Sequence, residues 1–294
     1  KPPHRKRIAN RYSDLYGRIK SFIGQGVQDG SLRPCRETDA ALSLFGMVQL
    51  TVLWLPGFDP ADTDRAAQEF TDIVLRGIAA DRSADWMGFE DLAGPAGGQH
   101  PGTKHASRQE AFYRVGSSFF NRKGFKGTSL DEIAEELDVT KGAFYYNLKD
   151  KDQLLLQCFE RSLAIMTATQ QNAMAAGGTG LQQLQRCASE LFAVQTGPAG
   201  PLIRFNLIPS LPARYKKRVL SRIAQVSDRF GAIISTGEAD GSIRPVDPAV
   251  AEQMLLSAID LSAELPWMRD LQDAGEGCRS YFRLYFGGLL NLAG

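Results

Sequence analysis

A short stretch of the sequence occurs twice, 211 positions apart, and this repetition constrains the fold more than any other feature. GVQDGSLRP at residues 26–34 recurs as GEADGSIRP at 237–245, and in the same register FTDIVLRGIA at 70–79 matches YFRLYFGGLL at 281–290. Asp-Gly turns are common after helices, so the shorter match alone has a trivial alternative explanation. Two matches in one register favour the duplication of a unit of about 80 residues.

The hydrophobic pattern predicts an all-α protein. Apolar residues recur at three- and four-residue spacing along most of the chain, whereas the alternation typical of strands is nearly missing. The 294 residues correspond to about two domains, and a hydrophobic content of 43% is sufficient for packed cores.

Charge and composition exclude several classes of protein. A net charge of +1 gives no general attraction to nucleic acid, so such binding needs a local patch. The apolar run at 42–58 falls short of the ~20 residues of a membrane span, and we interpret it as a buried helix with no membrane partner. Catalytic triads, zinc-protease motifs and phosphate loops are missing from the sequence, so we expect no enzyme, no metal and no cofactor. Cysteines without a CxxC pair fit a reducing cytoplasm; they are Cys35, Cys158, Cys187 and Cys278.

Glycine and proline divide the chain. GPAGGQHPG at 94–102 predicts a linker, which we place at residues 86–105. It separates a helical unit at 1–85 from a segment at 106–155 and a second helical unit at 156–294. Weaker breaks at 177–180 and 197–201 predict loops between helices. The chain begins without Met or a signal pattern, so we expect an upstream part to be absent.

The segment at 107–155 has the pattern of a helix-turn-helix. A first helix with an aromatic face ends at Gly124, and Ser129 with Glu132 forms a capping box that opens a two-turn helix. Its inward side carries Leu130, Ile133, Ala134 and Leu137. Asp138 and Val139 form a tight turn, and Thr140 caps the next helix.

In such a motif the second helix enters the major groove with small or polar residues at its N-terminal end. Lys141 can reach a guanine edge or a phosphate, and Ala143 can touch a thymine methyl group. Tyrosine and threonine hydroxyls can bind phosphate oxygens. The alternative is that the lysines are ordinary solvated side chains and the tyrosines pack at the rim. The predicted DNA-contacting set is Thr128, Thr140, Lys141, Gly142, Ala143, Tyr145, Tyr146 and Lys151.

The line GFKGTSLDEIAEELDVTKGAFYYNLKDKDQLL at 124–155 resembles the DNA-binding domain of the TetR family of transcriptional regulators. The resemblance implies a three-helix DNA-binding domain followed by a helical domain that holds a ligand pocket and dimerises through its last two helices. It also implies that the residues above, Gly142 apart, contact DNA mostly through its backbone. Three departures predict weak or salt-sensitive binding: Asp138 replaces the usual Gly, Asn147 and Leu148 replace His-Phe, and Asp150 and Asp152 flank Lys151.

A TetR-type subunit is about as long as the offset between the repeats. The resemblance therefore implies a tandem fusion, in which residues 1–85 are the final helices of a first regulator and residues from about 105 to 294 form a complete second one. The first DNA-binding domain would lie upstream of Lys1 or have been removed. Helices near 42–55 and 70–78 would pack against those near 250–265 and 281–290, forming an intramolecular pseudo-dimer that imitates the family's homodimer. Further self-association stays open.

A ligand site is predicted in the second helical unit. Apolar side chains between residues 154 and 265 could line a cavity, although core packing is the competing interpretation. Arg204 stands in an apolar stretch and needs a partner, which could be an anionic ligand or a carboxylate from Glu190 or Glu264. The predicted ligand-binding set is Phe159, Met166, Phe192, Arg204, Phe205 and Trp267.

These features predict a ligand-responsive transcriptional regulator in the cytoplasm. It would act as a repressor that binds double-stranded operator DNA and is released by a small apolar or amphipathic molecule. The alternative is a ligand-binding or protein-interaction module with weakened or lost DNA binding.

Overall fold

The computed structural model describes residues 3–82, 104–140, 150–264 and 274–291, and every regular element within these ranges is a helix. This confirms the all-α prediction. The predicted linker at 86–105 lies almost wholly outside the described residues. The longer helices are α1 (Pro3–Gln28), α2 (Glu37–Gln49), α4 (Thr63–Arg76), α6 (Lys104–Gly127), α7 (Leu130–Glu136), α9 (Lys151–Ala175), α10 (Gly180–Thr196), α11 (Ala213–Asp240), α12 (Pro248–Ser262) and α14 (Ala274–Gly287). Shorter turns are α3 (Thr51–Trp54), η1 (Leu55–Gly57), η2 (Pro60–Asp62) and η3 (Phe205–Ser210).

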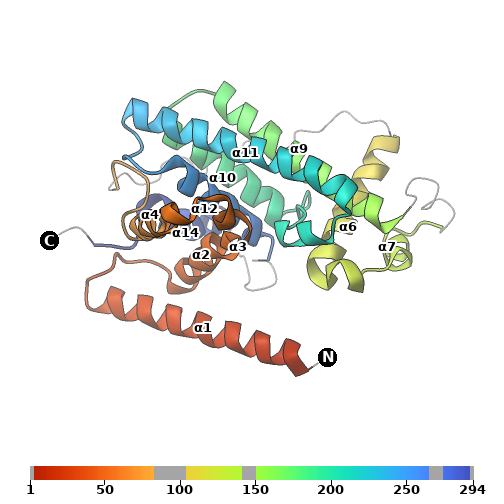
Figure 1. Cartoon of the computed structure of the whole chain (residues 1–294), viewed down its shortest axis with the longest axis horizontal. Helices are drawn as coiled ribbons and strands as arrows, with labels where there is room; N and C mark the ends of the chain where they lie inside the picture. The colour runs from red at the N-terminus through yellow and green to blue at the C-terminus, as the bar shows by residue number, and fades with distance from the viewer. Residues whose placement is uncertain (1–2, 83–103, 141–149, 265–273, 292–294) are drawn as a thin grey trace.

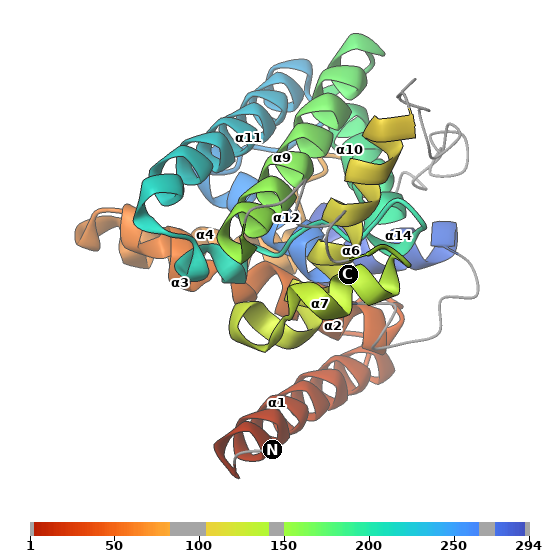
Figure 2. The ribbon, with the colours of Figure 1, turned by 90° about the vertical axis from the view of Figure 1, so that its right-hand side faces the viewer.

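The helices form two packed groups, and α12 and α14 contact both of them (Figure 1). In one group α9, α10 and α11 pack on one another, and α6 with α7 lies at their end (Figure 2). In the other, α2 and α4 contact α12 and α14. Helix α1 runs along the edge of the molecule and packs on α2. The predicted contacts between the segments near 42–55 and 70–78 and those near 250–265 and 281–290 are therefore present.

The apolar run at 42–58 contributes to this core. The stretch 37–57 is long and apolar enough to cross a membrane by length and composition alone. In the structure α2 ends at Gln49, and its residues Ala41, Leu42 and Met47 are buried. This burial is typical of a core helix and confirms the prediction for the first half of the run; in the second half α3 and η1 bury no residue, and Val52 is 75% exposed.

The two copies of the repeated nonapeptide adopt the same turn. Gly30 and Gly241 have φ angles of 79° and 78°, a left-handed conformation that favours glycine. In the first copy the Ser31 amide donates to Asp29 Oδ1 over 2.9 Å, and in the second the Ser242 amide donates to Asp240 Oδ1 over 2.9 Å. The sequence repeat is thus also a repeat of local structure.

The start of the helix-turn-helix segment also forms as predicted. Gly124 interrupts the helical run of α6 with φ 70° and ψ 170°. Ser129 then opens α7 with a complete capping box, because its hydroxyl accepts from the Asp131 amide while Glu132 accepts from the Ser129 amide. On the inward side Ile133 and Ala134 are buried, with Leu130 and Leu137 packed beside them.

Candidate functional site

The turn after α7 is built around a left-handed aspartate. Asp138 has a φ angle of 51°, and its amide donates to the Glu135 carbonyl over 3.0 Å. Val139 completes the turn by donating to the Ala134 carbonyl over 3.0 Å. Aspartate tolerates this conformation better than most residues, although glycine adopts it without strain. The geometry explains why a glycine would suit this position and how Asp138 can replace it.

The junction between α6 and α7 holds two of the predicted DNA contacts. Thr128 is 3% exposed, and its hydroxyl donates to the Gly124 carbonyl over 2.9 Å. Lys151 Nζ donates to the Thr128 carbonyl over 3.1 Å and lies 4.6 Å from the centre of the Phe125 ring. In this conformation both residues brace the junction, and their phosphate contacts stay predictions.

The rest of the predicted DNA-contacting set is mostly outside the described part of the chain. Thr140 is described and exposed, at the end of the turn. Lys141, Gly142, Ala143, Tyr145 and Tyr146 lie outside the described residues. Their contacts therefore also stay predictions.

Helix α6 is joined to the rest of the molecule through the loop before η3. Asn121 of α6 donates from Nδ2 to the Leu202 carbonyl over 2.8 Å and accepts from the Arg204 amide over 3.0 Å. Arg161 of α9 bonds Glu110 of α6 and the Ala199 carbonyl, each over 2.5 Å. These bonds fix the loop 199–204 against the helix that leads into the helix-turn-helix segment.

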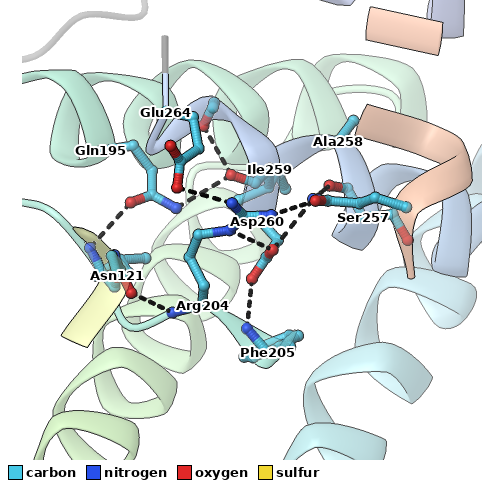
Figure 3. A network of polar contacts seen from close by, with 12 residues as sticks. Asn121, Gln195, Arg204, Phe205, Ser257, Ala258, Ile259, Asp260 and Glu264 are labelled. Atoms are coloured by element: carbon cyan, nitrogen blue, oxygen red, sulfur yellow. Dashed lines mark hydrogen bonds and ion pairs between the residues drawn. The ribbon is translucent and has the colours of Figure 1, made fainter. Parts of the chain in front are cut away.

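The same loop reaches the centre of the helical interface through the Arg204 side chain (Figure 3). Arg204 Nε donates to Asp260 Oδ2 over 3.2 Å, and Nη1 donates to Glu264 Oε1 over 2.7 Å. Its Nη2 bonds Gln49 Oε1 of α2. Of the two carboxylates proposed as partners of Arg204, Glu264 is confirmed; Asp260 was not foreseen.

Asp260 is the most buried charged group of this cluster, with 1% of its surface exposed. Burial raises the pKa of its carboxyl, while Arg204 and the Phe205 amide act against that rise. Its oxygens accept from the Phe205 amide over 2.7 Å and from Gln49 Nε2 over 3.1 Å, besides Arg204. A buried carboxylate needs such donors. An anionic ligand at Arg204 would have to displace these carboxylates, so the geometry favours an interface role for this arginine.

The chain segments that follow α4 and α14 cross each other and exchange equivalent hydrogen bonds. The Ile78 amide donates to the Tyr285 carbonyl over 3.2 Å, and Leu289, its counterpart at the offset of 211, donates to Val74 over 3.1 Å. The two isolated β-bridges are related in the same way: Leu32 pairs with Leu290, and their counterparts Ile243 and Ala79 pair with each other. Each of these backbone contacts made by one repeat thus has an equivalent made by the other.

Two pairs of counterparts meet each other directly. Gly77 and Gly288 have φ angles of 70° and 68°, and a Cβ built on either would lie 2.6 Å or less from the backbone of the other. Gln49 and Asp260 are the second pair, joined by the 3.1 Å hydrogen bond. In a two-fold arrangement, residues that meet their own counterparts lie on the axis. Gly77 with Gly288 and Gln49 with Asp260 are thus contacts between positions that the offset of 211 relates to each other.

The predicted apolar ligand residues lie in the core. Each of the four is 1% exposed or less: Phe159, Met166, Phe192 and Phe205. The ring centres of Phe159 and Phe205 are 6.5 Å apart, and Phe192 contacts the rings of Tyr281 and Phe282. A surface groove along α4 involves none of them. Trp267 lies outside the described residues. Ligand contacts by this set stay predictions.

Sequence reasoning missed the side chains that connect the parts. Asn121 and Gln49 are polar residues in helices where nothing in the local pattern marks them as connectors. Asp260 carried a usable signal, since it is an acid in the apolar run MLLSAIDLS and stands 211 positions from Gln49. An aligned search of the repeat for non-matching polar pairs would have found this contact.

Two family models match this chain. Residues 114–158 match the model described as bacterial regulatory proteins, tetR family, and residues 1–78 match the model described as tetracyclin repressor-like, C-terminal domain. The Transposon Tn10 TetC protein of Escherichia coli is 45% identical over 49 residues, which are 17% of this chain and 25% of that protein. The uncharacterized HTH-type transcriptional regulator YerO of Bacillus subtilis (strain 168) is 40% identical over 53 residues, 18% of each chain. The chain thus spans a quarter or less of the length of these relatives.

Solved structures share the fold. The ketosteroid transcriptional regulator KstR2 of Mycobacterium tuberculosis aligns with a TM-score of 0.53 at 18% identity, over 65% of this chain and 98% of that one. AibR in complex with isovaleryl coenzyme A and operator DNA aligns with a TM-score of 0.50 at 18% identity, over 62% of this chain and 100% of that one. Nearly two thirds of this chain therefore corresponds in fold to a whole regulator subunit. The two family matches thus make residues 1–78 and 114–158 similar to the TetR family of transcriptional regulators, and the all-helical fold agrees with this similarity.

Proposed function

We propose that this regulator is a repressor that binds operator DNA through residues 128–151 and releases it when a small apolar or amphipathic molecule binds the helical domain. The observation that carries the proposal is the joint between α6 and the loop 199–204. Through Asn121 and Arg204 this joint connects the DNA-binding segment to α12 and α2. A ligand that repacks α9, α10 or the loop changes the position of α6.

We further propose that residues 1–82 and the helices after α11 form an intramolecular pseudo-dimer. The C-terminal-domain model matches upstream of the DNA-binding model, an order that a tandem fusion produces. The exchanged backbone bonds and the two axial pairs support it, since an isologous interface returns every contact. The exposure of apolar side chains on α1 also supports the pseudo-dimer, because α1 and its counterpart α11 have different neighbours. Leu15 and Phe22 of α1 are 49% and 71% exposed, while their counterparts Val226 and Ile233 are 1% exposed in α11, which packs on α9 and α10.

Release of DNA follows from a shift between conformations. Recognition helices must be about 34–36 Å apart to enter successive major grooves. A ligand that prefers another spacing lowers DNA affinity by its differential binding energy. A coupling of about 1–3 kcal/mol changes affinity roughly 5- to 150-fold.

The alternative function, a module that has lost DNA affinity, rests on Asp138, Asp150 and Asp152. Two of these acids have local partners. Asp150 caps α9, because its Oδ1 accepts from the Gln153 amide over 2.7 Å, and Asp152 lies 3.8 Å from Arg214. Asp138 adopts the left-handed conformation of the turn after α7. These structural roles account for the acids without a loss of DNA binding, and we therefore favour the regulator.

The test is fluorescence anisotropy of the purified chain with labelled DNA from its own upstream region, titrated at several salt concentrations. Saturable binding that survives nonspecific competitor supports the regulator. Lys141→Ala should weaken it by about 1–3 kcal/mol, or less for a contact to phosphate alone. The matched control is Lys217→Ala, which removes the same charge from an exposed position on α11.

The first outcome below contradicts the regulator, the second favours the alternative module, and the third concerns Lys141 alone. Binding that competitor abolishes removes the operator-specific function. If Asp138→Gly with Asp150→Ser then creates tight, salt-dependent binding, the alternative module is favoured. Equal affinities of Lys141→Ala and Lys217→Ala would remove Lys141 from the DNA contacts.

A further inference from the structure

We propose that the interface between the two repeats selects unlike partners: the first repeat pairs with the second, and pairing of the second repeat with another copy of itself is disfavoured by charge. The inference rests on the proposed pseudo-dimer and specifies its partner choice. It is carried by positions where the repeats differ although their contacts are equivalent.

The axial position is the most buried of these. Gln49 of the first repeat donates to Asp260 of the second, and Arg204 binds both side chains. Gln49 Nε2 also donates to the Ser257 carbonyl over 3.1 Å. Two second repeats would bring Asp260 against Asp260 at this point, each with its own Arg204 and Glu264, so that carboxylates would outnumber guanidinium groups. Two carboxylates this close, nearly buried, repel strongly unless one takes up a proton.

The rim of the interface carries a reversed pair. Arg36 lies 2.9 Å from Glu276, and the counterpart contact joins Asp247 to Arg65 over 3.2 Å. The offset of 211 relates Arg36 to Asp247 and Arg65 to Glu276, so the polarity of each position is inverted between the repeats. Self-pairing would therefore place Arg36 against Arg65 in one case and Asp247 against Glu276 in the other. Both like-charge pairs are unfavourable.

The third pair of equivalent contacts joins unlike charges in one copy and brings like charges together in the other. Arg244 lies 2.7 Å from Asp72, whereas the counterpart contact sets Arg33 near Arg283. The two arginines oppose each other, and carbonyl oxygens of Gly287 and Arg82 accept hydrogen bonds from Arg33. Self-pairing of the first repeat would combine Arg33 with Asp72, and self-pairing of the second would combine Arg244 with Arg283. This pair thus adds to the penalty for two second repeats and offsets the rim penalty for two first repeats.

The experiment places like charges against each other at the interface between the repeats, within the full chain. Gln49→Glu places an acid against Asp260 with almost no change in shape and keeps an acceptor for Arg204, whereas Gln49→Met removes all three hydrogen bonds of Gln49 without adding charge. Both are made alone and with Asp260→Asn, and urea unfolding gives the folding equilibrium constant. We expect Gln49→Glu to lower that constant at least tenfold more than Gln49→Met does. With Asp260→Asn this difference should vanish or change sign, since the amide can donate to Glu.

The rim is tested by Arg36→Glu, Glu276→Arg and their combination. Each single substitution should lower the folding constant about two- to fivefold, as for exposed ion pairs, and the double variant should recover most of the loss. Arg18→Glu makes the same charge change at an exposed position of α1 and is the control. Sedimentation velocity should show a monomer at low concentration.

Three results overturn the proposal. They are equal stability of Gln49→Glu and Gln49→Met with Asp260 intact, a double rim variant no better than the singles, and an obligate dimer of the unchanged chain. None of them depends on DNA. A chain that binds no operator, yet shows the expected stabilities for the Gln49 and Asp260 variants, contradicts the proposed repressor function and supports the proposed pairing of unlike repeats.

Discussion

Replacing Gly77 with alanine should destabilise the molecule through the crossing of the two repeats. Gly77 has φ 70° and ψ −174°, and strain of this kind in a residue with a side chain costs about 1–3 kcal/mol. The new Cβ would lie 2.3 Å from the Phe286 carbonyl oxygen. That oxygen accepts from the amides of Ile78 and Ala79 over 3.0 and 2.9 Å, bonds worth about 0.5–1.5 kcal/mol each.

We therefore expect Gly77→Ala to reduce the free energy of unfolding by about 3 kcal/mol, which corresponds to a fall of roughly 5–10 °C in Tm. Urea unfolding followed by circular dichroism measures the loss. Gly288→Ala, the counterpart with φ 68°, should cost about the same. Gly17→Ala is the control, because its Cβ would meet no atom within 4 Å and a helical alanine gains about 0.5–1 kcal/mol. Losses under about 1 kcal/mol for both crossing variants would refute the reasoning.

Three further predictions concern single groups. Burial raises the pKa of Cys158 and Cys187 to about 12, so iodoacetamide at pH 8 should leave both thiols unmodified in the folded chain and modify them in urea; mass spectrometry of the peptides reads this out, and rapid labelling of folded Cys158 would contradict it. Asn121→Ala leaves the Leu202 carbonyl and the Arg204 amide without their partner and should cost about 1–3 kcal/mol in urea unfolding; a neutral result would show that the joint does not depend on this side chain. Hydrogen bonds from Ser31 and Ser242 lower the pKa of Asp29 and Asp240, so these carboxyls should titrate below their ordinary values by NMR; the stability they contribute is present above the unfolded pKa and is lost as the pH falls through the folded one. Ser242→Ala should raise the pKa of Asp240 part of the way, because the amides of Gly180 and residue 242 still donate to it, and should leave Asp29 unchanged.

Local patterns predicted the helices well because their determinants lie within a few residues. The capping box at Ser129 and Glu132, the stop at Gly124 and the repeated Asp-Gly turn each depend on short-range hydrogen bonds or a left-handed glycine. The repeat also predicted which helices would pack together, since it revealed a register shared by distant segments.

The connections between parts could not be predicted in the same way. Arg204 was recognised as a charge in need of a partner, yet its partners lie 56, 60 and 155 positions away, and only the folded chain brings them together. Thr128 shows the opposite limit. Its place in the motif predicts a contact between its hydroxyl and a phosphate, which stays a prediction; in the structure the hydroxyl donates to the Gly124 carbonyl. The position in a motif predicts where a side chain lies, but the packing around it determines its hydrogen-bond partner.

The contact between Gln49 and Asp260 also bears on how such a molecule can change over evolutionary time. In a homodimer every substitution at the axis appears twice, so an acid there must face itself. In the proposed pseudo-dimer the two sides are encoded separately, and one can acquire a carboxylate while the other acquires its hydrogen-bond donor. A substitution in one half need not be tolerated by the other. Each half of the proposed pseudo-dimer is then free to change without its counterpart.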